Sequence, residues 1–173
     1  MSRLKFGDPR DPDTDVGPMI DEGAAQDTYD MVQEAVAGGA EILLGGRCEG
    51  TMFAPTVVGN TTPDMRVNRE EIFAPVITVT PYDDFDEAIA LANDTDYGLQ
   101  SGLFTQNVNR IMRAFEEIEV GGLQINDVST FRADQMPYGG VKGSGIGREG
   151  PRYAMEEMTE PKLMVINLGG GNS

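Results

Sequence analysis

Short runs of β-branched and apolar residues alternate with helical patterns along this chain, and this alternation constrains the fold more than any other feature. Strands are expected at residues 41–44, 53–58, 76–80, 102–104 and 122–125. Apolar residues at helical spacing predict helices at residues 22–37, 83–94 and 107–118. Strands that alternate with helices are joined by crossover connections, which favour a largely parallel sheet. We therefore expect an α/β fold of three layers, with helices on both faces of the sheet.

The ends of the chain differ in character from this middle part. Residues 7–18 are rich in proline and aspartate and are expected to form an irregular entry loop. A short helix at 151–158 and a final strand at about 162–167 are expected near the other end. Residues 169–173 read as a flexible tail. Because no linker divides the chain, residues 1–168 are predicted to form one domain with one core.

The charge of the chain is strongly negative. There are 13 basic and 29 acidic residues, a formal net charge of −16. Nucleic acid is not expected as a partner, because its phosphates are bound by clustered basic residues. Two interpretations of the acidity stay open: an ordinary hydrated surface, or adaptation to a cytoplasm of high salt concentration.

Few residues are available for disulfides, metal binding or membrane insertion. Cys48 is the only cysteine, and the chain contains no histidine. No intrachain disulfide and no metal site are expected. The N-terminus has no apolar segment of the signal-peptide type, and no run is long enough to span a membrane. A soluble, cytoplasmic protein is predicted.

Residues 136–150 form a glycine-rich segment, MPYGGVKGSGIGREG, in which Gly145, Gly147 and Gly150 satisfy the pattern GxGxxG. A dinucleotide-binding turn of that pattern directly follows a buried strand. A helix and a second strand come after it, and an acidic residue lies about twenty positions beyond the turn. Here PYGGVKGS precedes the pattern and only the last residues of the chain follow a short helix. We therefore interpret the segment as a close-approach loop in the wall of a site.

Cys48 is the only thiol that could serve as a nucleophile. It lies in GGRCEGT between two short expected strands, next to Arg47. A cysteine nucleophile is activated by a neighbouring base or a helix N-terminus, and neither is expected here. No catalytic residue is therefore predicted in this chain.

The sequence EEIFAP at residues 70–75 places a carboxylate and an aromatic ring two positions apart before a proline. In an extended segment, Glu71 and Phe73 would point to the same side and could contact one ligand. The alternative is that Phe73 belongs to the core and Glu71 is a solvated acid.

Five separated blocks, taken in order, resemble the C-terminal part of the aldehyde dehydrogenase superfamily. They are PTVVGN, EEIFAP, DEAIALANDTDYGLQSGLFT, GGLQIN and PYGGVKGSGIGREG, and the resemblance runs from about Leu4 to Ile166. It implies a catalytic-domain fold and the coenzyme NAD or NADP. By motif position it implies that Glu71 hydrogen-bonds the nicotinamide ribose and that Phe73 packs beside the nicotinamide. The family motif is EEIFGP, so Ala74 departs from it.

The resemblance also gives the loop at residues 126–136, NDVSTFRADQM, a role in lining the aldehyde tunnel. Phe131, Arg132 and Tyr138 are the substrate candidates. The pattern is most similar to members acting on lactaldehyde, phosphonoacetaldehyde or, without phosphorylation, glyceraldehyde 3-phosphate. A guanidinium suits a carboxylate or phosphate bidentately. The alternative for Arg132 is a loop ion pair with Asp127 or Asp134.

In this family a cysteine thiolate attacks the aldehyde, hydride passes to the nicotinamide, and a glutamate activates water to hydrolyse the thioester. The resemblance places that thiol, that base and the coenzyme domain before Met1. The chain alone is thus expected to be inactive and to bind neither NAD nor NADP tightly. Two interpretations follow: part of an aldehyde dehydrogenase, or a non-catalytic assembly module derived from one. In either case residues 162–167 match the strand through which family members form homo-oligomers.

Overall fold

The computed structural model describes Met1 and residues 3–169, and it divides the chain into two compact units. The first unit comprises Met1–Thr95, and the second begins at Asp96. The sequence predicted one undivided domain. The boundary between the units lies in the short turn NDTDYG, whose composition is not that of a linker. Most of the flexible tail predicted at 169–173 lies outside the described residues.

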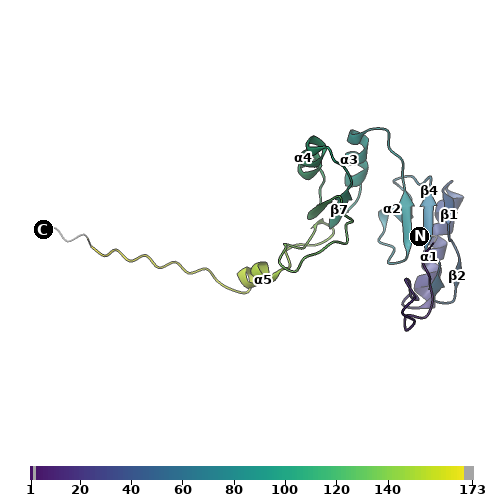
Figure 1. Ribbon diagram of the computed structural model, residues 1–173, viewed down its shortest axis with the longest axis horizontal. Helices are drawn as coiled ribbons and strands as arrows, with labels where there is room; N and C mark the ends of the chain where they lie inside the picture. The colour runs from purple at the N-terminus through teal and green to yellow at the C-terminus, as the bar shows by residue number, and fades with distance from the viewer. Residues whose placement is uncertain (2, 170–173) are drawn as a thin grey trace. The chain divides into compact units, whose positions relative to one another are not determined.

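In the first unit, a long helix covers a three-stranded sheet (Figure 1). Helix α1 spans Glu22–Ala37, as the sequence predicted, and the side chain of Asp21 accepts a hydrogen bond from the Ala24 N–H. Strand β4 (Thr56–Gly59) lies in the middle of the sheet, antiparallel to β1 (Glu41–Leu44) and parallel to β5 (Val76–Val79). The strand expected at 53–58 is interrupted, since β3 (Met52–Phe53) pairs instead with β2 (Cys48–Glu49).

The buried core belongs to this first unit. It joins residues of α1 to residues of the strands and of the short helix α2 (Arg66–Arg69). Its members are Met31, Val32, Ala35, Ala40, Phe53, Val58 and Val67. Helix α3 (Phe85–Asn93) ends the unit, with Asp84 as its N-cap. The core anchors both α1 and α2, and the candidate coenzyme residues Glu71 and Phe73 follow α2 along the chain.

The second unit is built from short pairs of strands. Strands β7 (Gln100–Leu103) and β8 (Gly122–Ile125) are parallel and are joined by α4 (Val108–Glu117). Strands β6 (Tyr97–Gly98) and β9 (Val141–Lys142) are antiparallel. Helix α5 (Pro151–Glu157) follows the glycine-rich segment.

The α/β class is confirmed, with parallel pairing in β4–β5 and β7–β8. The strands are divided among four small sheets, so the described residues do not themselves form one large parallel sheet. Residues 162–167 form no strand in this single chain, because no described segment pairs with them, and the strand expected there stays a prediction for an oligomer. A strand depends on a hydrogen-bonded neighbour, and these residues are exposed instead.

Candidate functional site

Glu71 and Phe73 line one groove in the first unit, whose volume is about 850 Å³. Helix α1 forms the facing wall with Ala24, Asp27 and Thr28, which lie at i, i+3 and i+4 and so share a face. Sequence reasoning missed Asp27 and Thr28. The available signal was the presence of polar side chains beside the apolar stripe of α1.

The backbone turns sharply at Phe73, which has φ of +50°. The segment was predicted to be extended, and it is not extended at this residue. A bulky residue in the left-handed region is strained, and such strain is found preferentially at functional sites. Phe73 is 81% exposed, so the alternative that it belongs to the core is wrong for this chain. Glu71 is also exposed.

Arg66 positions the beginning of the Glu71–Phe73 segment. Its Nε and Nη2 donate to the two carboxylate oxygens of Glu70 at 2.9 and 3.0 Å, and its Nη1 donates to Glu34 of α1 at 3.0 Å. The hydrogen bonds from Arg66 lower the pKa of Glu70, and those to Glu70 and Glu34 raise the pKa of Arg66. Arg66 therefore ties the segment to α1 while its own charge is matched by two carboxylates.

Arg132 and Tyr138 come together in the second unit. The guanidinium carbon of Arg132 lies 4.3 Å from the centre of the Tyr138 ring, and Nη2 donates to Glu149 at 2.8 Å. Glu149 and Tyr138 also exchange backbone hydrogen bonds of 2.6 and 3.1 Å. The alternative of an ion pair with Asp127 or Asp134 named other partners; this backbone bridge brings Glu149 to the loop, and Arg132 pairs with it.

Phe131 precedes Arg132 in the same loop and is about half exposed. Of the three substrate candidates, Arg132 and Tyr138 are joined by this cation–π contact, and Phe131 is the neighbour of Arg132 along the chain. The coenzyme candidates lie in the first unit and the substrate candidates in the second.

The glycine-rich segment is a loop of close backbone approach. A Cβ atom on Gly121 would overlap the carbonyl of Gly139, and Arg148 Nη1 donates to the carbonyls of Gly140 (2.9 Å) and Gly147 (2.7 Å). Within the segment, the GxGxxG pattern that begins at Gly145 follows the two-residue strand β9, which is antiparallel to β6. A dinucleotide-binding turn would follow a buried parallel strand, so this geometry differs from one.

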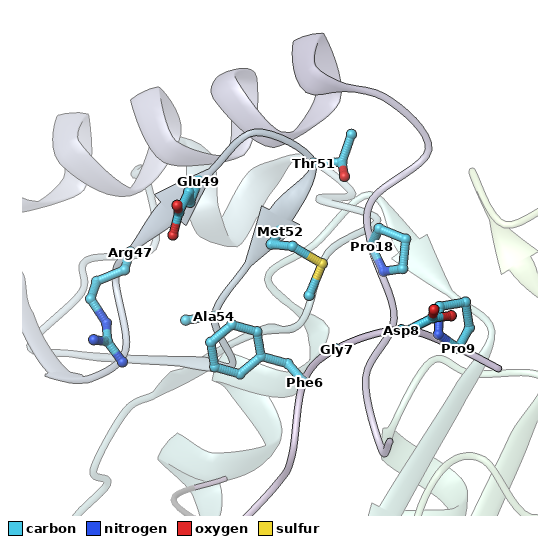
Figure 2. A pocket seen from close by; sticks show the side chains of 10 residues that line it. All are labelled: Phe6, Gly7, Asp8, Pro9, Pro18, Arg47, Glu49, Thr51, Met52 and Ala54. Atoms are coloured by element: carbon cyan, nitrogen blue, oxygen red, sulfur yellow. The ribbon is translucent and has the colours of Figure 1, made fainter. Parts of the chain in front are cut away.

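A second hollow in the first unit, of about 500 Å³, was not predicted from the sequence. Figure 2 shows Phe6 and Met52 on its apolar side, with Arg47 and Glu49 at one end and Asp8 at the other. It lies between the entry segment and the β2–β3 hairpin. Cys48 begins that hairpin, and its Sγ lies 3.7 Å from the carbonyl oxygen of Gly50.

Within the described part of the chain, no helix has the length and apolarity needed to cross a membrane.

Comparison with known proteins gives a consistent result. The sequence model of the Aldehyde dehydrogenase family matches residues 1–164. The chain is 51% identical over 166 residues to 3-sulfolactaldehyde dehydrogenase of Priestia aryabhattai, covering 96% of this chain and 35% of that protein.

Two solved structures extend the similarity to the fold. The first is aldehyde dehydrogenase 21 from Physcomitrella patens in complex with the reaction product succinate, with TM-score 0.93 and 47% identity over 97% of this chain and 35% of that one. The second is glyceraldehyde-3-phosphate dehydrogenase from Methanocaldococcus jannaschii complexed with NADP, with TM-score 0.87 and 44% identity over 91% and 34%. The chain thus spans about a third of the length of these relatives.

Proposed function

Because this chain belongs to the aldehyde dehydrogenase family, we propose that it forms the C-terminal part of an NAD(P)-dependent enzyme that oxidises a small polar or anionic aldehyde to the acid. The observation that carries the substrate class is the arrangement of Arg132 over Tyr138 and beside Glu149. The coenzyme assignment rests on the groove that contains Glu71 and Phe73.

The groove suits the nicotinamide ribose better than the pyrophosphate of a dinucleotide. A carboxylate accepts hydrogen bonds from ribose hydroxyls, and Glu71 is exposed for that contact. Phosphates would be repelled by Asp27, Asp30 and Glu70, while the cation that lines the groove, Arg66, is already paired. When bound, NAD or NADP supplies the hydride acceptor. Glu71 would hold the ribose, and the exposed ring of Phe73 would flank the nicotinamide.

Arg132 would bind the anionic end of the aldehyde. Its guanidinium donates one N–H to Glu149 and lies over the ring of Tyr138. A guanidinium has five N–H donors in a planar fork, so it can bind a second anion while it keeps the first. The names of the relatives support this class, since sulfolactaldehyde carries a sulfonate, succinate a carboxylate and glyceraldehyde 3-phosphate a phosphate. Phe131 and Tyr138 would line the path of the substrate.

By itself the chain would be inactive and would bind NAD or NADP only weakly, because the thiol, the base and the coenzyme domain would lie outside it. A cytoplasmic location fits an enzyme that uses a soluble coenzyme. A second candidate, a non-catalytic assembly module, is favoured by one observation. Leu163, Met164, Val165 and Ile166 are consecutive and 68 to 87% exposed, so they could add a strand to a second copy. Homo-oligomerisation through residues 162–167 follows from either candidate.

The test joins residues 1–166 to the part of the Priestia aryabhattai enzyme that precedes the matched region. We expect this single polypeptide to oxidise 3-sulfolactaldehyde with NAD or NADP. Glu71→Gln and Phe73→Ala should raise the KM for the coenzyme, while Glu41→Gln, at an exposed glutamate of β1 that does not line the groove, serves as the matched control. A chimaera that folds but does not oxidise the aldehyde would contradict the proposal. Unchanged coenzyme kinetics in both variants would remove the roles of Glu71 and Phe73.

A further inference from the structure

The β2–β3 hairpin of the first unit has two faces with different surroundings. Cys48 and Phe53 are cross-strand partners, and their side chains pack in or against the buried core. Glu49 and Met52 are the next pair, so their side chains lie on the opposite face. That face borders the hollow of about 500 Å³. One face of the hairpin thus packs on the core, and the other forms a wall of the hollow.

Arg47 and Ala54 continue this wall. The N–H of Ala54 donates to the carbonyl of Arg47 at 2.9 Å, which extends the hairpin by one residue on each strand. Residues two positions apart in a strand point to the same side, so Arg47 shares the face of Glu49. Figure 2 shows these two side chains at the same end of the hollow. The hairpin therefore presents a guanidinium and a carboxylate together.

The facing wall is the segment before α1, and hydrogen bonds of the backbone hold it. Phe6 forms a parallel β-bridge with Val16, and the Gly7 N–H donates to the Val16 carbonyl at 3.0 Å. The Met19 N–H donates at 2.8 Å to the carbonyl of Thr51, which lies in the turn of the hairpin. Both walls are thus fixed within the first unit. The volume between them falls in the range of small-molecule sites.

Three charged side chains line the hollow, and one of them already has a partner. Asp8 accepts hydrogen bonds from Arg10, from Nε at 3.0 Å and from Nη2 at 2.6 Å. Arg47 and Glu49 are exposed, and no described residue forms an ion pair or a side-chain hydrogen bond with either of them. The lining therefore offers one unmatched cation and one unmatched anion.

These two charges determine which kind of ligand is complementary to the hollow. A simple carboxylate would be repelled by Glu49, and a simple ammonium by Arg47. A free amino acid carries a carboxylate and an ammonium on one carbon atom. The guanidinium fork of Arg47 can donate to the carboxylate, and Glu49 can accept from the ammonium. Beyond the charged end, Phe6 and Met52 provide an apolar surface for the side chain of the ligand (Figure 2).

We propose that this hollow binds a free α-amino acid with an aromatic or large apolar side chain. The carboxylate of the ligand pairs with Arg47, its ammonium pairs with Glu49, and its side chain packs against Phe6 and Met52. Aromatic rings interact favourably both with another ring and with a methionine sulfur. All of the lining residues belong to the first unit, so the site is complete within this chain. It shares no lining residue with the candidate coenzyme groove.

Titration of the isotope-labelled 173-residue chain with L-phenylalanine, followed by NMR of the backbone amides, tests the proposal. We expect saturable shifts at Glu49, Thr51 and Met52, with a Kd of about 1 mM or below. N-acetyl-L-phenylalanine lacks the ammonium and L-phenylalaninamide lacks the carboxylate, so the Kd of each should be about fivefold or more higher. Glycine lacks the apolar side chain and should bind more weakly than L-phenylalanine by about tenfold or more.

Two substitutions test the roles of the charged side chains. Arg47→Met and Glu49→Gln should each raise the Kd for L-phenylalanine by about fivefold or more. Arg47→Met should also remove the preference for L-phenylalanine over L-phenylalaninamide, because the partner of the carboxylate is gone. Arg69→Met is the matched control, since Arg69 pairs with Asp94 and does not line the hollow, and its Kd should stay within about twofold.

Several results would overturn the proposal. They are the absence of saturable shifts up to about 10 mM L-phenylalanine, shifts confined to other parts of the chain, and unchanged affinity in Arg47→Met or Glu49→Gln. Equal binding of N-acetyl-L-phenylalanine would instead identify a site for simple carboxylates, and equal binding of L-phenylalaninamide a site for simple cations. None of these measurements uses the coenzyme or an aldehyde, so a failure here would leave the proposed enzymatic function to be judged by the kinetics of the chimaera.

Discussion

The guanidinium of Arg66 binds both carboxylate oxygens of Glu70, with Nε 2.9 Å from Oε1 and Nη2 3.0 Å from Oε2. These hydrogen bonds lower the pKa of Glu70 from its ordinary value of 4.5. A carboxyl group whose pKa is lowered by folding stabilises the folded state above the unfolded pKa, and this contribution is lost as the pH falls through the folded pKa.

We therefore expect Arg66→Met to raise the pKa of Glu70 towards 4.5. The difference in free energy of unfolding between wild type and variant should be largest near neutral pH and should shrink in acid. NMR titration of the Glu70 carboxyl carbon measures the first effect, and urea unfolding at several pH values measures the second. Arg69→Met is the control, since Arg69 pairs with Asp94. An unchanged Glu70 titration in Arg66→Met would contradict the prediction.

Substitutions at two glycines of the first unit allow the cost of backbone strain to be measured apart from the cost of steric overlap. Gly39 and Gly45 both have positive φ, of +104° and +79°. A Cβ on Gly39 would meet nothing within 4 Å, whereas one on Gly45 would overlap the Pro55 carbonyl and lie 2.7 Å from Thr56 Oγ1. Gly39→Ala should cost about 1 kcal/mol from strain alone. Gly45→Ala should cost about 2–3 kcal/mol or more, because overlap is added. Urea unfolding measures both, and equal costs would show that the Gly45 contact relaxes freely.

Much of the fold follows from local sequence signals, because these signals act within a few residues. Helix α1 begins and ends as predicted, since Asp21 caps it and two glycines follow it. Strand β8 likewise has its predicted bounds. The break between β3 and β4 was missed, because the hydrogen bond from Thr56 N–H to the distant Pro75 carbonyl helps set where β4 begins.

The candidate site was less predictable, because its contacts join residues distant in sequence. Glu71 lines one groove with Asp27 and Thr28 only because α1 packs against this part of the unit. Arg132 meets Glu149 only because Tyr138 and Glu149 pair through their backbones. Residue types and motifs indicated candidate side chains, but local spacing contains no information on such pairings.

The core of the first unit should dominate the stability of the chain alone. Phe53 is fully buried in that core, so Phe53→Ala should lower the free energy of unfolding of this unit by about 3–5 kcal/mol. Phe115→Ala removes an equal side chain from a position on α4 that is 71% exposed, and should change the free energy of unfolding by less than about 0.5 kcal/mol. Amide hydrogen exchange of α1 measures the stability of the first unit directly. Similar losses in both variants would contradict the assignment of the core.

The charge of −16 should make stability depend on salt. Repulsion between exposed carboxylates is screened within roughly 10 Å at about 0.1 M salt, so the urea unfolding midpoint should rise between about 10 mM and 0.5 M KCl. Sucrose in place of KCl is the uncharged control. A further rise at molar KCl would favour adaptation to a high-salt cytoplasm, and a plateau would favour an ordinary acidic surface. A midpoint independent of KCl throughout would contradict the prediction.

Arg132 should determine selectivity for anionic aldehydes in the chimaera that joins this chain to the amino-terminal part of the Priestia aryabhattai enzyme. Arg132→Ala removes the donor fork, so KM for 3-sulfolactaldehyde should rise by about tenfold or more, while KM for neutral propionaldehyde should change by less than about twofold. Arg132→Lys keeps the charge but not the fork and should give an intermediate KM. Steady-state kinetics with both aldehydes provide the measurement. Equal losses for the two aldehydes would mean that Arg132, held by Glu149 at 2.8 Å, acts only to shape the loop.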